Sequence, residues 1–102
     1  MTTIKQPGFY ITSKKGFQIT FANGWTVSVQ FGPGNYSANH DAQIGHEEEL
    51  SGKRGSDTAE VAYFPAGGKL QPFDGGDTVQ GYQTPAQVLA LLNTVAQKAM
   101  SL

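Results

Sequence analysis

The feature that most constrains this chain is the run from Phe9 to Phe31, in which two short polar segments separate three apolar-rich stretches. A two-residue turn at Asn23-Gly24 would set the apolar residues of the second stretch opposite polar residues of the third. A three-residue loop over 22–24, closed by Gly24 in the left-handed conformation, sets apolar opposite apolar. A shift of the strand pairing by one residue would place the apolar side chains of one strand on the solvent-exposed face, so the register is strongly specified. The predicted pairs are Phe21 with Trp25, Ile19 with Val27, and Phe17 with Val29.

A second loop of the same kind, over 14–16, predicts the register of the first strand. It pairs Ser13 with Phe17, Ile11 with Ile19, and Phe9 with Phe21. The meander therefore comprises strands at about 9–13, 17–22 and 25–31, with one apolar face. The other face is rich in Thr, Ser and Gln, and we expect it to be solvated, as is common in antiparallel sheets; a polar ligand or partner surface is the alternative.

The second half of the chain predicts further strands and one helix. Residues 58–64 read as a fourth strand, with either Val61 and Tyr63 or Ala62 and Phe64 inward. Short strands are expected at 69–73 and 78–82. Thr84, Pro85 and Gln87 form a capping box with proline at the first helical position, and apolar residues then recur at helical spacing. The predicted fold class is α+β: an antiparallel β-meander of four to six strands with one C-terminal α-helix, about 85–99, on its apolar face.

Length and composition favour one domain, 1–102, with residues 1–8 as a loose lead-in. There is no cysteine, so neither a disulfide framework nor thiolate chemistry is available. The first residues lack the features of a secretory signal, and no apolar run approaches the length that spans a bilayer, so we expect no membrane association. Seven basic and eight acidic residues give a net charge of -1, which argues against binding of duplex nucleic acid.

The longest stretch without apolar periodicity, 32–57, carries most of the chemically specific side chains. Loops this long are uncommon in compact domains and are usually functional or disordered. Backbone N–H groups of the Gly-Pro-Gly turn at 32–34 can form an anion-binding nest, and an aromatic side chain with basic partners can bind a nucleotide. A plain structural turn is the alternative. The candidate ligand- or partner-binding residues are Asn35, Tyr36, His40, Asp41, Lys53 and Arg54.

The same segment supports a competing, enzymatic interpretation. Imidazole and carboxylate groups, which suit zinc, iron or nickel, are supplied by His40, Asp41, His46 and the glutamates at 47–49. Their spacing matches no familiar ligand motif, and an acidic run beside a basic pair is typical of a solvated charged segment. We therefore assign no catalytic residue, metal or cofactor, and keep a metal-dependent or acid–base hydrolase as the alternative.

Three stretches resemble a group of small, mostly uncharacterised bacteriophage proteins: GWTVSVQFGPGNY at 24–36, AEVAYF at 59–64 and GYQTPAQVL at 81–89. In that group a cysteine commonly follows the Asn-Tyr pair, whereas this chain has Ser37. These motifs mark fold rather than chemistry, so no catalytic residue carries over. The resemblance implies a phage accessory protein of the host cytoplasm, which acts by binding: it inhibits a host enzyme or sequesters a defence signal.

The sequence thus leads to a non-enzymatic binding protein that engages a host protein or a nucleotide-like ligand through residues 32–57. Beside the hydrolase, a virion or structural accessory protein is a second alternative. Self-association into a homo-oligomer, through an edge strand or the polar sheet face, is a further expectation.

Overall fold

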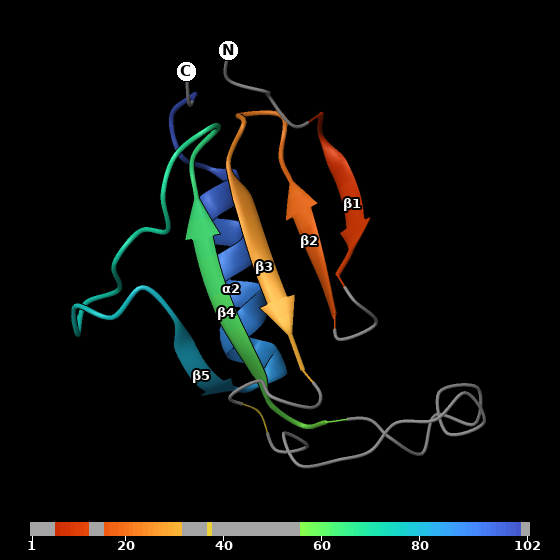
Figure 1. The fold of residues 1–102 in the computed structure, drawn as a ribbon, viewed down its shortest axis with the longest axis vertical. Coiled ribbons are helices and arrows are strands. Elements are labelled where there is room, and N and C mark those ends of the chain that lie inside the picture. The colour runs from red at the N-terminus through yellow and green to blue at the C-terminus, as the bar shows by residue number, and fades with distance from the viewer. Residues whose placement is uncertain (1–5, 13–15, 32–36, 38–55, 101–102) are drawn as a thin grey trace.

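The structure is a computed structural model that describes residues 6–12, 16–31, 37 and 56–100. Within these residues, five strands form one open antiparallel sheet in sequence order, and a single helix covers one face (Figure 1). This architecture confirms the predicted α+β class. The elements are β1 (Gly8–Ile11), β2 (Gly16–Thr20), β3 (Thr26–Gln30), β4 (Ala59–Phe64), β5 (Gln80–Gln83) and α2 (Pro85–Ala96).

The hairpin of β2 and β3 has the predicted register. Ile19 lies opposite Val27, and Phe17 lies opposite Val29. The Phe21 N–H donates to the Trp25 carbonyl at 2.9 Å, which leaves three residues in the loop. Gly24 has φ 87°, in the region that favours glycine, so the predicted loop chemistry is confirmed.

The predicted register of β1 is wrong by two residues. Phe9 lies opposite Ile19 and Ile11 opposite Phe17, so Phe9 does not pair with Phe21. The reason lies at Gly16, which belongs to β2 rather than to the loop: a Cβ there would come within 2.1 Å of the Val29 carbonyl oxygen on β3. Because the shift is an even number, the apolar side chains of β1 keep their predicted face.

The expected strand at 69–73 is not formed, whereas the fourth strand is confirmed. The last strand, predicted at 78–82, begins two residues later and ends one residue later, at Gln80–Gln83. The Gln71 N–H donates to the Tyr63 carbonyl at 2.9 Å, but the next residue is Pro72, which has no N–H to continue a ladder. The chain then folds on itself, since the Phe73 N–H donates to the Asp77 carbonyl at 2.8 Å.

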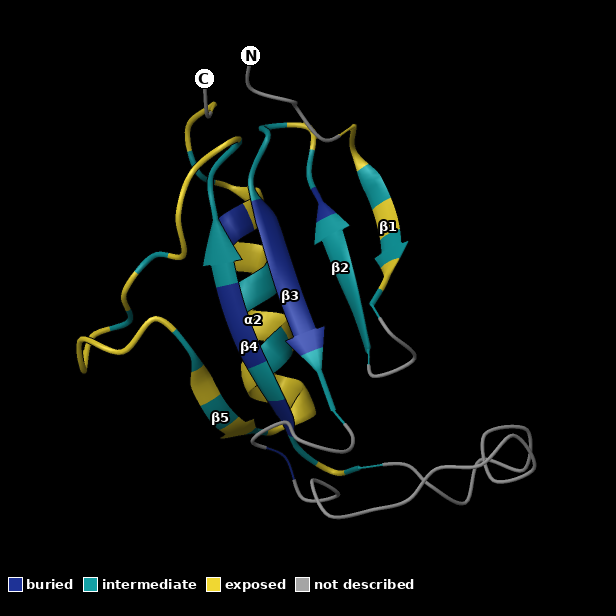
Figure 2. Cartoon of the chain, viewed as in Figure 1, coloured by how far each residue is buried: buried dark blue, intermediate teal, exposed yellow. Residues whose placement is uncertain are grey.

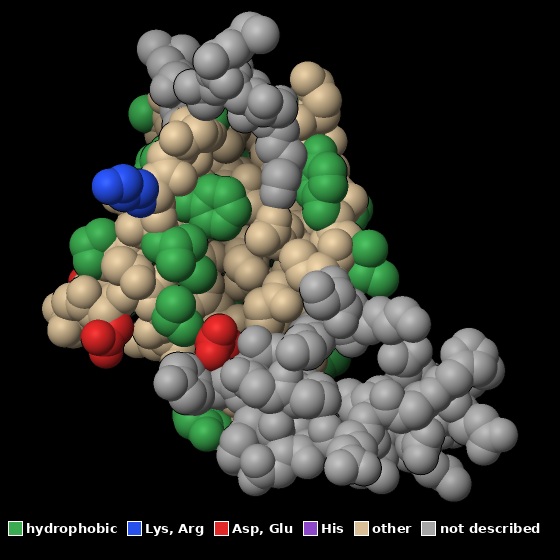
Figure 3. Space-filling model, viewed as in Figure 1, with side chains coloured by type: hydrophobic (Ala, Val, Ile, Leu, Met, Phe, Trp, Pro, Cys, Tyr) green, Lys and Arg blue, Asp and Glu red, His purple; other side chains and the backbone are tan. Residues whose placement is uncertain are grey.

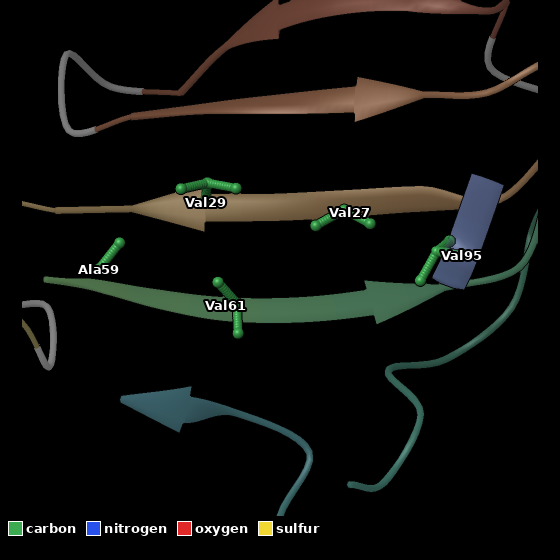
Figure 4. Close-up of a cluster of buried hydrophobic side chains, with 5 residues drawn as sticks. All are labelled: Val27, Val29, Ala59, Val61 and Val95. Carbon is green, nitrogen blue, oxygen red and sulfur yellow. The ribbon is translucent and has the colours of Figure 1, made fainter. Parts of the chain in front are cut away.

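The core lies between α2 and the two central strands. Figure 4 shows its five buried side chains, one from α2 and four from β3 and β4: Val95, Val27, Val29, Ala59 and Val61. Val61 and Tyr63 pack on this side, which decides between the two orientations left open for the fourth strand. The helix packs on β3 and β4, the strands that Figure 2 shows as the most buried part of the sheet.

The opposite face of the sheet is not solvated at its centre, contrary to our expectation. Thr20 and Thr26 are each 2% exposed, and Ser28 is also buried. The two threonines lie opposite each other, and their hydroxyl oxygens are 2.8 Å apart. Figure 3, viewed from this side, shows polar side chains and backbone across the middle of the sheet. The hydroxyls form a hydrogen bond in place of water, so burial leaves these groups satisfied.

The helix begins as predicted and ends earlier. Thr84 Oγ1 accepts from the Gln87 N–H at 3.3 Å, and Gln87 Oε1 accepts from the Thr84 N–H at 2.8 Å, which forms the capping box. The helix stops at Ala96 rather than near residue 99. At this end Asn23, from the β2–β3 loop, donates through Nδ2 to the carbonyls of Val95 at 2.9 Å and Lys98 at 3.0 Å. The Val95 carbonyl also accepts from the Lys98 N–H at 3.2 Å, so the loop adds a side-chain donor to carbonyls at the C-terminal end of the helix.

Substitution of Asn23 tests whether the loop caps the helix. Asn23→Ala is expected to lower the free energy of unfolding by about 1–2 kcal/mol, because the hydrogen bonds that the Asn23 side-chain amide donates to carbonyls at the helix end are lost. Asn23→Asp should be no better, since a carboxylate cannot donate and carries negative charge at the negative end of the helix dipole. Urea unfolding measures both.

The matched control is Asn93→Ala, at an exposed position of α2, which should change stability by less than about 0.5 kcal/mol. Equal losses at Asn23 and Asn93, or an Asn23→Asp variant as stable as the unsubstituted protein, would contradict the capping role.

Candidate functional site

The residues predicted to bind a ligand or partner, Asn35, Tyr36, His40, Asp41, Lys53 and Arg54, lie outside the described residues. The same holds for His46 and the glutamates at 47–49 of the enzymatic alternative. The structure therefore leaves both interpretations untested. Both ends of the 32–57 segment are described, however: Phe31 precedes it, Ser56 and Asp57 are its last residues, and Thr58 follows it.

An apolar pocket of about 270 Å³ lies at this end of the sheet, between α2 and the strands beneath it. The sheet contributes Phe17, Val29 and Phe31 to its lining, and the first turns of the helix contribute Val88, Leu89 and Leu92. The pocket exists because the side chains of α2 do not fill the space over the ends of β2 and β3. Both flanks of the 32–57 segment reach it, through Phe31 on one side and Ser56, Asp57 and Thr58 on the other.

Polar groups line part of the pocket. The Ser56 hydroxyl donates to the Thr58 carbonyl at 2.7 Å and lies 3.3 Å from the Thr58 N–H, a local turn that holds this stretch of chain. Gln83 donates to the Gly81 carbonyl at 3.0 Å. Asp57 is exposed and adds a carboxylate. The site thus combines a largely apolar lining with a few polar groups, the usual composition of a ligand-binding pocket.

The size and lining of the pocket limit what it can hold. Pockets for drug-sized ligands have volumes of roughly 300–1,000 Å³. At about 270 Å³ this pocket suits one ring or one branched aliphatic group rather than a whole dinucleotide. Within the described residues no His, Asp or Glu side chains cluster in a way that could hold a metal ion. The described part of the site therefore provides shape and apolar contact.

The chain matches no family model, no curated protein and no solved structure. The functional inference consequently rests on its own residues. The described ranges also contain no helix that is both long and apolar enough to cross a bilayer.

Sequence reasoning assigned the pocket's apolar residues to the core and did not identify the pocket. Phe17, Phe31 and Leu92 are half-buried rather than buried. A signal was present in the sequence: a helix is about 10 Å wide, whereas five strands spaced at about 4.8 Å span roughly 19 Å. One helix therefore cannot cover the whole apolar face.

A second hollow of about 480 Å³, lined by Asp77, Thr78, Val79, Gly81 and Tyr82, lies at β5. It contains the one described non-glycine residue with positive φ, Tyr82 at 55°. Here the pairing of β4 with β5 shifts, because Ala59 lies opposite Gln83 but Val61 lies opposite Gln80. Residues 81 and 82 thus both face residue 60, which is a β-bulge. The left-handed conformation of Tyr82 follows from this bulge and needs no ligand to explain it.

The bulge predicts an unusual order of stabilities at Tyr82. Tyr82→Gly is expected to be more stable than Tyr82→Ala by about 1 kcal/mol, because a Cβ atom makes the left-handed conformation sterically unfavourable and glycine has no Cβ. Thermal unfolding of the two variants measures the difference.

Gln80, an exposed residue of the same strand with no positive φ, is the control. There the order should reverse, with Gln80→Ala more stable than Gln80→Gly by about 0.5–1 kcal/mol. The same order at both positions would argue against backbone strain at Tyr82.

Proposed function

We propose that this protein is a small non-enzymatic binding protein that engages its partner at the end of the sheet where residues 32–57 leave and rejoin it. The observation that carries the proposal is the apolar pocket at that end, bounded by Phe31 on one flank of the segment and Ser56 to Thr58 on the other. In this proposal the pocket takes an apolar group of the partner, and Asn35, Tyr36, His40 and Asp41 contact its polar groups.

The described residues favour a protein partner that inserts an apolar side chain. The pocket is lined chiefly by aliphatic and aromatic side chains, and its volume matches a single Leu, Phe or Trp anchor. The described charge at the pocket is the Asp57 carboxylate, which would repel a phosphate. A nucleotide-like ligand would need the basic groups of Lys53 and Arg54 to offset that charge.

The resemblance of the sequence to small bacteriophage proteins also supports a binding function. A small phage accessory protein acting in the host cytoplasm would bind a host protein and inhibit it, or would sequester a nucleotide-like defence signal. Both actions need a binding site and no chemical step.

Three defined probes distinguish these ligands. N-acetyl-tryptophanamide and N-acetyl-leucinamide represent an apolar side chain in a protein, and AMP represents a nucleotide. Amide shifts in ¹H–¹⁵N spectra of the full chain are expected to move at Phe17, Phe31 and Leu89 with the first two probes. Shifts that occur with AMP alone would favour the nucleotide. If no probe moves the amides of the pocket, the pocket is not the binding site.

Leu89→Glu is expected to weaken binding of the tryptophan probe by about tenfold or more, because it sets a charge against an apolar lining. Leu89 is 58% exposed, so this change should leave the fold intact. The control is Leu70→Glu, at an exposed leucine that does not line this pocket. Equal affinity in the two variants, measured by the same titration, would place the binding site elsewhere.

A further inference from the structure

Among the described strands β1 forms one edge of the sheet, and two of its apolar side chains are largely exposed. Phe9 is 78% exposed and Ile11 is 81% exposed, the highest values among the large hydrophobic residues of the described chain. Both lie on the helix side of the sheet, since Phe9 pairs with Ile19 and Ile11 with Phe17. The helix packs on β3 and β4 and leaves this part of the face bare (Figure 1).

The backbone of the same two residues is directed away from the sheet. The Thr12 N–H donates to the Gly16 carbonyl at 3.2 Å, so the even-numbered residues of β1 form the hydrogen-bonded pairs with β2. The β2–β3 hairpin gives the same result. Phe21 and Trp25 are hydrogen-bonded to each other, so the odd-numbered residues of β2 direct their N–H and C=O groups toward β3, and the even-numbered residues direct theirs toward β1. The N–H and C=O groups of Phe9 and Ile11 consequently point outward, ready to pair with another strand.

The two edges of the sheet differ in how they are protected. At β5 the bulge at residues 81 and 82 and the left-handed Tyr82 disrupt the strand, which discourages pairing. β1 is regular over Gly8–Ile11, and its sequence GFYI contains no charge and no proline. β1 has only four residues and follows Pro7, but within the strand it lacks the charges and bulges that usually protect an edge, so it is the edge better suited to pairing.

We propose that the occupant of the β1 edge is the β1 strand of a second copy of this chain. Two such strands, antiparallel about a two-fold axis at Tyr10, set Phe9 of one copy opposite Ile11 of the other, and the outward backbone groups meet in register. The strand is self-complementary in this arrangement: apolar side chains share one face, the tyrosines meet on the other, and no like charges face each other across the pair. Two five-stranded sheets become one.

The buried area sets the strength of this dimer. A fully covered aromatic side chain buries about 150–250 Å², and edge pairing covers only part of each Phe9 and Ile11 side chain, so the apolar area removed from water is on the order of a few hundred Å². Stable interfaces bury roughly 1,200 Å² or more, and smaller ones belong to weak, reversible complexes. The dimer is therefore dependent on concentration. It forms without a ligand and does not rest on the proposed function.

Sedimentation velocity of the full chain tests the dimer. From about 20 µM to about 1 mM, a range that suits a weak interface, the sedimentation coefficient should rise from the monomer toward the dimer value. Ile11→Lys should weaken association by about tenfold or more, because it sets two like charges near each other at the interface. Leu70→Lys, which adds the same charge at an exposed apolar residue outside β1, should not weaken it.

A backbone variant distinguishes association through strand pairing from association through non-specific hydrophobic contact. Ile11→Pro removes an N–H that points outward and leaves the bonds of β1 to β2 in place, so the monomer should keep its circular dichroism spectrum while association is lost. If this variant unfolds, amide exchange in the unsubstituted chain gives the same information. The Phe9 and Ile11 amides should then exchange more slowly at high concentration, with Tyr10 protected throughout.

A monomer at every concentration would overturn the proposal, as would a dimer that persists in folded Ile11→Pro or whose Phe9 and Ile11 amides remain unprotected. None of these outcomes bears on probe binding at the apolar pocket, so the dimer and the proposed function fail independently.

Discussion

The three-residue loop between β2 and β3 is the element on which the rest of the structure depends. Gly24 takes a positive φ, and this sets Ile19 against Val27 and Phe17 against Val29. The same loop presents Asn23 to the last carbonyls of α2, some seventy residues further along the chain. One short segment therefore sets the register of the hairpin and also contacts the end of the helix that covers it. A change in loop length would disturb both at once.

Coverage by a single helix explains the surfaces that remain available for binding. α2 contains 12 residues, about 18 Å of helix, and it packs on β3 and β4. At one end of the sheet this leaves the apolar pocket, and at the β1 edge it leaves Phe9 and Ile11 bare. The pocket and the edge lie on the same face of the sheet. Both surfaces for which we propose a contact, the pocket and the β1 edge, thus exist because one helix covers only part of the sheet.

The sequence predicted the elements better than their extents, for identifiable reasons. The capping box of Thr84 and Gln87 and the Gly24 loop were predictable because each depends on residues close in sequence. The register of β1 was not, because Gly16 is required by a backbone contact with Val29 on β3 and not by the turn in which it was placed. The candidate site likewise has one part that the sequence predicted and one part that it did not. Its polar residues came from the composition of 32–57, whereas the pocket arises where helix and sheet leave a gap.

By itself, the sequence determined the fold class, the β2–β3 register and the start of the helix, because turn geometry, the two-residue strand period and helix capping act over a few residues. Only the tertiary structure decided which strands the helix covers, where the helix ends, which polar side chains are buried and which edge of the sheet is left unprotected. These depend on contacts between residues far apart in the chain, such as Asn23 with Val95 and Gly16 with Val29, whose distances no local pattern encodes.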